Sequence, residues 1–244
     1  MNLQRYRKSL KKAWRRLQKR LRGGRNILVL GDSHCGVFEY CFDRGLLAPH
    51  WLNCEIVAGA TAWGLNNDHS ATQAWQKFDH ALQRFADCDV VVIMLGECDC
   101  SFALWKKAEC LDVPPEILLD YALGGIRRLV QRVHEDSPAR PRKIILVGAI
   151  LPTVNDGAVS TQENLLRRTV NALQVERTRL VLSYNEKLCQ LAESLGVAYF
   201  DLSLQTMDPE RRLVDERFVA CPEDHHLSHP ASGPLWAASL LSQL

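Results

Sequence analysis

Five short apolar runs, separated by stretches with helical periodicity, constrain the fold of this 244-residue chain more than any other feature. Three of the runs are nearly continuous Val, Ile and Leu, which is typical of strands that are buried on both faces of a sheet. Strands that alternate with helices in this way predict a parallel sheet with helices on both sides. The predicted strands are 26–31, 54–58, 89–96, 143–150 and 197–202, and the predicted helices are 36–46, 68–86, 115–135, 177–195 and 231–243.

The charges divide the chain into two parts. Residues 1–25 contain eleven of the thirty Lys and Arg residues and no acid, which leaves 19 basic and 28 acidic residues in the remainder. Apolar positions spaced by three and four residues over 3–21 predict an amphipathic helix, and Gly23 and Gly24 are expected to end it. We therefore expect a basic helical arm at 1–25 and an acidic domain at 26–244.

A basic amphipathic helix has several uses. It can lie on an anionic membrane surface, pack its apolar stripe on a partner protein or on the body of the chain, bind nucleic acid, or serve as a mitochondrial presequence. Nucleic acid is disfavoured because the body is acidic and contains no base-reading module. We expect a membrane surface or a protein partner.

The composition excludes other classes of protein. With 47% hydrophobic and 24% charged residues the chain is globular, and it contains neither a membrane-spanning run nor the apolar core of a secretory signal. The nine cysteines include no CxxC pair, so zinc-ribbon and thioredoxin patterns are absent. We expect reduced thiols in a cytoplasmic protein that is at most peripheral to a membrane.

Ser33 is the first candidate for chemistry. In parallel sheets with helices on both sides, ligands bind outside the carboxyl ends of the strands, and Ser33 directly follows the first predicted strand. A hydroxyl at this place can face the cleft as a nucleophile, and the N–H groups of the helix start can hold an oxyanion. The alternative is that Ser33 is only the N-cap of the helix.

A serine nucleophile needs a base, and histidines cluster late in the chain at His225, His226 and His229. Glu223 stands three positions before His226, on the same side of a helical turn, and could orient its ring. Asp224 is the more usual residue type but stands only two positions before His226. The cluster is also compatible with a zinc site or with a plain surface loop.

Four short sequence blocks occur in order along the chain. They are Gly31-Asp32-Ser33, Gly59, Gly96-x-x-Asp99 and a late acid–His-Leu segment. Together they resemble the four sequence blocks of the SGNH (GDSL-type) hydrolases, over about residues 26–244. The resemblance implies a flavodoxin-like, three-layer α/β/α sandwich with a five-stranded parallel sheet, and hydrolysis or transfer of an ester.

The resemblance also implies roles for single residues. Ser33 is the implied nucleophile, His226 the general base, and Glu223 or Asp224 the acid that orients the base. The backbone N–H groups of Ser33 and Gly59 are implied donors to the oxyanion. No metal or organic cofactor is required.

The sequence departs from the family pattern at two positions. The third block usually has Asn as an oxyanion donor, where this chain has Cys98, and a thiol is a weak donor. Loss of one donor costs about 10²–10³ in rate. The fourth block usually has Asp where this chain has Glu223. Two further candidates, His34 and Asp99, have either a pocket-lining or a structural role.

The departures leave more than one function open. The form Gly96-Glu97-Cys98-Asp99-Cys100 resembles a GExDC variant associated with surface-polysaccharide pathways, although Ser101 replaces the Arg that usually follows. The first hypothesis is a serine esterase or deacylase that acts on a small-molecule or carbohydrate ester, with O-acyl groups of a carbohydrate as one substrate class. The alternatives are an acyltransferase and a non-catalytic SGNH-like binding module in a polysaccharide- or membrane-associated pathway.

Overall fold

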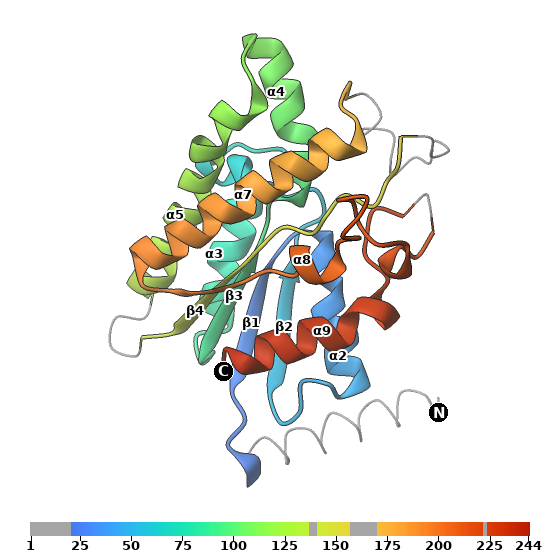
Figure 1. The fold of residues 1–244 in the computed structure, drawn as a ribbon. Helices are drawn as coiled ribbons and strands as arrows, with labels where there is room; N and C mark the ends of the chain where they lie inside the picture. Colours follow the sequence, from blue (N-terminus) through green and yellow to red (C-terminus); the bar gives the residue numbers. More distant parts are fainter. Residues whose placement is uncertain (1–20, 137–140, 157–169, 222–223) are drawn as a thin grey trace, which may run out of the picture.

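The protein is built around one five-stranded parallel sheet with the strand order β2-β1-β3-β4-β5 (Figure 1). A computed structural model describes residues 21–136, 141–156, 170–221 and 224–244. The three-layer α/β/α architecture predicted from the sequence is confirmed. The strands are β1 (Asn26–Gly31), β2 (Trp51–Ile56), β3 (Val90–Met94), β4 (Lys143–Val147) and β5 (Ala198–Phe200).

Helices cover both faces of the sheet, as the strand–helix alternation requires. On one face α2 packs beside α9, where Phe38 meets Trp236 with ring centroids 5.5 Å apart. On the other face α5 contacts both α3 and α7 (Figure 1). The α-helices are α2 (Gly36–Arg44), α3 (Ala74–Arg84), α4 (Leu104–Leu111), α5 (Leu119–Asp136), α7 (Gln174–Leu195), α8 (Ser203–Thr206) and α9 (His229–Ser242).

Single-turn elements fill several of the connections. The 3₁₀ turns are η1 (Ser33–Cys35), η2 (Trp63–Asn66), η4 (Pro115–Leu118) and η5 (Glu216–Phe218), and η3 (Asp99–Ala103) is a π-helical turn.

The central strands form the core. Residues Ile27 to Leu30 of β1 and Val90 to Val92 of β3 are completely buried, which explains why both runs are continuous Val, Ile and Leu. The connection after β1 leads to β2 on one side of the sheet, whereas the connection after β3 leads to β4 on the other side. The carboxyl ends of β1 and β3 are therefore the switch point at which sheets of this kind bind ligands.

Two glycines shape the switch point. A Cβ on Gly31 would lie 2.1 Å from the Met94 carbonyl oxygen and 2.4 Å from Cys35 Sγ, so only glycine allows β1 to end this close to β3. Gly96 has a φ of +128°, and a Cβ there would lie 2.4 Å from the Tyr184 ring. Both glycines belong to the sequence blocks that define the candidate site.

The second strand and the region after β3 differ from the sequence prediction. The expected strand 54–58 is β2, which begins at Trp51 and ends at Ile56. It is an edge strand whose side chains are mostly half-buried, and its polar residues Asn53 and Glu55 interrupt the apolar run on which the prediction was based. The π-turn η3 and the two-turn helix α4 were not predicted, because they are too short to show a clear period.

The predicted arm helix over 3–21 lies outside the described residues apart from Leu21, so the arm stays a prediction. Among the described helices, none is long and apolar enough to cross a membrane.

Candidate active site

Ser33 begins η1, directly after the carboxyl end of β1. Asp32, and not Ser33, caps this turn: its Oδ1 accepts a hydrogen bond of 3.0 Å from the backbone N–H of His34. The alternative of Ser33 as the N-cap is therefore wrong. Ser33 is partly exposed, while Asp32 and His34 on either side of it are buried. The turn holds the serine hydroxyl at the switch point.

His226 comes from the loop before α9 and is oriented by Asp224. Asp224 Oδ1 lies 2.8 Å from His226 Nδ1 and also accepts a hydrogen bond of 2.9 Å from the backbone N–H of His226. Partial desolvation favours the neutral carboxyl, but these two bonds from His226 outweigh it and lower the pKa of Asp224. Asp224 is thus ionised near neutral pH, with Nδ1–H of His226 as its donor. Glu223 lies outside the described residues.

Ser33, Asp224 and His226 line one pocket of about 480 Å³. The pocket therefore brings Ser33 together with residues 191 and 193 positions later in the sequence, at the edge of the sheet where ligands of this fold class bind. The other residues that line it are Ala220, Leu227, Ser228, His229 and Pro230. An acid, an imidazole and a hydroxyl around one cavity form the constellation of nucleophilic acyl transfer.

Gly59 lies in the exposed turn after β2 and has a φ of +71°. The loop that follows it is tied to the end of β3 by the buried carboxylate of Asp99. Asp99 Oδ2 accepts a hydrogen bond of 2.7 Å from the backbone N–H of Ala62, and its Oδ1 accepts one of 2.9 Å from that of Trp63. Of the two roles considered for Asp99, these contacts favour the structural one: it fixes the loop that begins at Gly59.

Removing the Asp99 carboxylate is expected to weaken the fold. In Asp99→Ala the N–H groups of Ala62 and Trp63 lose their acceptor, and each orphaned buried donor costs about 1–3 kcal/mol. We expect urea denaturation to show a free energy of unfolding lower by about 2–4 kcal/mol. Asp120→Ala, which removes an exposed partner of Lys187, is the control and should cost less than about 1 kcal/mol. Equal losses in the two variants would contradict the structural role of Asp99.

Asp99 should also make stability depend on pH. Burial, together with the smaller effect of the Asp32 charge, raises the pKa of Asp99 to about 7, although the hydrogen bonds from Trp63 and Ala62 oppose the rise. Between pH 4 and 7 the unfolded chain has released this proton while the folded chain still holds it. Rising pH therefore lowers the free energy of unfolding over this range. The total loss is about 1.4 kcal/mol for each unit by which the pKa of Asp99 in the folded chain exceeds that in the unfolded chain.

The measurement compares wild type with Asp99→Asn, which cannot titrate. The free energy of unfolding of wild type minus that of the variant should decrease as pH rises from 4 to 7 and become constant above it. A difference that stays flat or increases over this range would refute the raised pKa.

Cys98 is buried at the start of η3, next to Asp99. It stands at the carboxyl end of β3, as the sequence blocks predicted, but it is not among the residues that line the pocket of Ser33 and His226. Its contribution to an oxyanion site stays a prediction.

His34 was a candidate for lining the pocket, but the structure buries it. The side chain is 3% exposed, its Nδ1 lies 2.9 Å from Asp32 Oδ1, and its Nε2 lies 3.2 Å from the carbonyl oxygen of His225 and 3.6 Å from Glu97 Oε2. His34 therefore connects η1, the end of β3 and the loop before α9 that carries His225 and His226, which we call the histidine loop. Sequence reasoning missed Glu97 and Asp32 as partners of this ring, because residues from three chain segments meet here.

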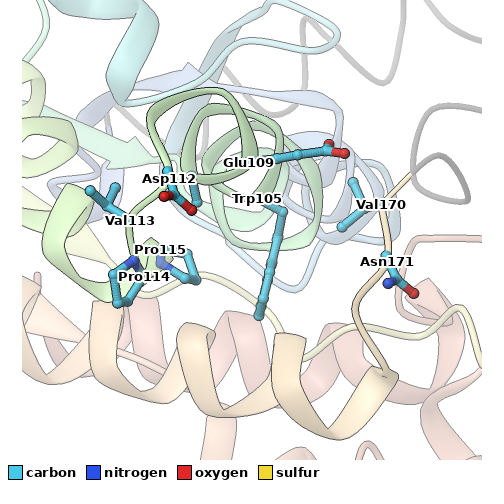
Figure 2. Close-up of a pocket in the computed structure, with 9 residues that line it drawn as sticks. Trp105, Glu109, Asp112, Val113, Pro114, Pro115, Val170 and Asn171 are labelled. Carbon is cyan, nitrogen blue, oxygen red and sulfur yellow. The ribbon is translucent and has the colours of Figure 1, made fainter.

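A different pocket, of about 480 Å³, lies beside α4 and the turn that follows it (Figure 2). Trp105 and Glu109 from α4 face it together with Asp112, Val170 and Asn171 (Figure 2). None of the candidate site residues lines this pocket.

Known proteins resemble this chain in structure but not in sequence. The sequence matches no protein-family model, and no curated protein matches it significantly. Solved structures do match. A GDSL-like lipase from Bacteroides thetaiotaomicron is 14% identical, with a TM-score of 0.58 over 90% of this chain and 89% of that chain. The native aryl esterase of M. smegmatis is 18% identical, with a TM-score of 0.58 over 91% of this chain and 100% of that chain. The carbohydrate acetylesterase Est24 from Sinorhizobium meliloti is 15% identical, with a TM-score of 0.56 over 90% of this chain and 100% of that chain.

The chain has the fold of these hydrolases. The three-layer α/β/α sandwich implied by the sequence blocks is thereby confirmed over the body of the chain. Identities of 14–18% carry the fold and not the activity. The chemistry depends on the side chains of the candidate site itself.

Proposed function

We propose that the protein is a serine esterase or deacylase that forms an acyl-enzyme on Ser33. The observation that carries the proposal is the pocket lined jointly by Ser33, His226 and Asp224, with Asp224 Oδ1 held 2.8 Å from His226 Nδ1. This contact fixes the tautomer of His226 that has its lone pair on Nε2, which is the form that can take a proton from a serine.

The reaction follows from these roles. Ser33 Oγ attacks the ester carbonyl carbon while His226 Nε2 accepts the hydroxyl proton. The tetrahedral intermediate expels the alcohol, which leaves with the proton from His226, and an acyl-serine remains. Water then attacks the acyl carbon with His226 again as base, and the acid is released as Ser33 regains its proton. Asp224 stabilises the imidazolium in each step.

Backbone N–H groups are the proposed oxyanion donors. Ser33 lies at the start of η1 and Gly59 lies in the turn after β2, the neighbouring strand to β1. Asp99 supports this arrangement because it anchors the loop after Gly59. With Cys98 in place of an amide side chain, we expect slower turnover than a site with three strong donors would give.

The substrate class that we propose is an O-acyl ester of a carbohydrate. The support is the similarity to solved structures named carbohydrate acetylesterase and the GECDC block at the end of β3. An acyltransferase would use the same acyl-serine with an alcohol in place of water, and comparing acyl transfer to a sugar with hydrolysis would separate the two.

Labelling with a fluorophosphonate probe tests the proposal. We expect wild-type protein to form one covalent adduct, which mass spectrometry of proteolytic peptides places on Ser33, and His226→Ala to label much more slowly because its serine has no base. Turnover of p-nitrophenyl acetate measured in parallel should decrease in the same variant. A wild-type protein that neither labels nor turns over ester would overturn the esterase and favour the binding module.

The basic arm over residues 1–25 stays a prediction. We propose that it docks the domain on an anionic membrane surface, because its sequence combines an apolar stripe with eleven basic residues and no acid. Flotation with vesicles that contain an anionic lipid, comparing residues 1–244 with 26–244, tests this. Equal flotation of the two chains would refute it.

A further inference from the structure

Three histidines from two distant segments meet beside the pocket. His34 comes from η1, and His225 and His226 come from the loop before α9. Their ring centroids are separated by 4.8 Å for His34 and His226, 4.0 Å for His225 and His226, and 5.5 Å for His34 and His225. Each ring offers one nitrogen such that all three nitrogens lie within 4.8 Å of one another. The proposed esterase mechanism uses only one of these rings.

Carboxylates orient two of the three rings in the way that metal sites require. Asp32 Oδ1 lies 2.9 Å from Nδ1 of His34, and Asp224 Oδ1 lies 2.8 Å from Nδ1 of His226. A carboxylate that binds one ring nitrogen fixes the tautomer and makes the other nitrogen a better ligand, and most metal-binding histidines have such a partner. In the His226 ring this leaves Nε2 to face a metal. In the His34 ring Nε2 lies 3.2 Å from the His225 carbonyl oxygen and has to exchange that contact for the metal.

The charges around the cluster also favour a cation. Glu97 Oε2 lies 3.6 Å from Nε2 of His34 and is buried, so it adds an oxygen ligand or a counter-charge. In the described part of the chain, Asp32 and Asp224 form ion pairs with histidines and none with Lys or Arg. Three carboxylates thus surround three imidazoles, and a divalent cation would neutralise most of their charge.

We propose that His34, His225 and His226 together bind one Zn²⁺ ion, and that this ion inhibits the esterase by occupying Nε2 of His226. Imidazole nitrogens suit zinc, and a site of three histidines with an open fourth position is one of its common arrangements. The inhibition rests on the proposed function, because Nε2 of His226 is the atom that takes the serine proton. The binding itself does not rest on it.

Binding requires a modest local change. Nitrogens bound to one zinc at about 2.0–2.1 Å lie roughly 3.3 Å apart, so the widest nitrogen pair has to close by about 1.5 Å. Nε2 of His34 exchanges its contact with the His225 carbonyl oxygen for the metal and gives up the proton of that hydrogen bond to solvent. The histidine loop is the part that moves, because His34 is held inside the fold by Asp32.

Equilibrium dialysis of the full chain against ZnCl₂, after treatment with a chelator, tests the binding. We expect one zinc per chain and at least about tenfold weaker binding in His34→Asn and in His225→Asn, since each variant loses a ligand. His80→Asn is the matched control, because His80 is exposed on α3, and its affinity should equal that of wild type. Unchanged affinity in both ligand variants would overturn the site.

Cobalt distinguishes this site from the exposed thiols of Cys110 and Cys221. Co²⁺ in place of Zn²⁺ should give the visible d–d bands of nitrogen and oxygen ligation without thiolate charge-transfer bands. This measurement needs only wild-type protein, so it decides the question even where a variant fails to fold. Thiolate bands at one equivalent of Co²⁺ would overturn the site.

The inhibition has a separate readout. Zinc should lower p-nitrophenyl acetate turnover of wild type, EDTA should restore it, and the ratio of rates with and without zinc should be closer to one in His225→Asn. Binding without inhibition, or an increase in rate with zinc, would overturn the inhibitory role. A wild type that shows no esterase activity would refute the proposed function, and the dialysis and the cobalt spectrum would still decide the zinc site.

Discussion

Ser33→Ala should lower the kcat of p-nitrophenyl acetate hydrolysis by at least about 1,000-fold, because it removes the atom that forms the acyl-enzyme. The residual rate would come from the oxyanion donors and from binding of the substrate, which do not depend on the hydroxyl. The fold should be unaffected, since Asp32 and not Ser33 caps η1. Thermal unfolding of the variant should therefore resemble that of wild type.

Ser242→Ala is the matched control for this substitution. Ser242 is exposed at the end of α9 and donates a hydrogen bond only to the Ser239 carbonyl oxygen of its own helix. It undergoes the same chemical change far from the site, so its kcat should equal that of wild type. If Ser33→Ala kept wild-type turnover while remaining folded, Ser33 would not be the nucleophile.

Asp224→Asn should lower kcat roughly 100- to 10,000-fold with little change in KM. The amide can present its NH₂ group to Nδ1 of His226, which favours the wrong tautomer of the ring and no longer stabilises the imidazolium. Because hydrogen bonds from His226 hold the pKa of Asp224 below its usual value, wild type should keep the ionised acid throughout the neutral range. Steady-state kinetics of the variant at pH 7 measure this effect.

Glu223→Gln separates the two acids that the sequence offered. Nδ1 of His226 already has Asp224 as its partner, so Glu223→Gln should leave kcat close to that of wild type. A large loss in Glu223→Gln together with a small loss in Asp224→Asn would assign the orienting role to Glu223.

Much of the fold could be predicted from the sequence because the signals are local. Continuous apolar runs predicted β1 and β3, and Gly196 ends α7 in the left-handed conformation, as its position after the helix indicated. The prediction placed the start of the edge strand β2 three residues too late, because Asn53 breaks the apolar pattern directly before Cys54. The short turns near the site, η3 above all, could not be predicted, since they follow from packing and not from periodicity.

The same division holds for the candidate site. The sequence by itself determined that a serine follows the first buried strand and that acids and histidines come before the last helix. These features consist of residue types and their spacing, which can be read directly from the amino-acid sequence. The tertiary structure decided which acid meets Nδ1 of His226, and it turned His34 away from the pocket toward Asp32, Glu97 and the histidine loop. Those contacts join segments that lie up to 191 residues apart. Only packing sets the distances between such segments, so no local pattern in the sequence could show them.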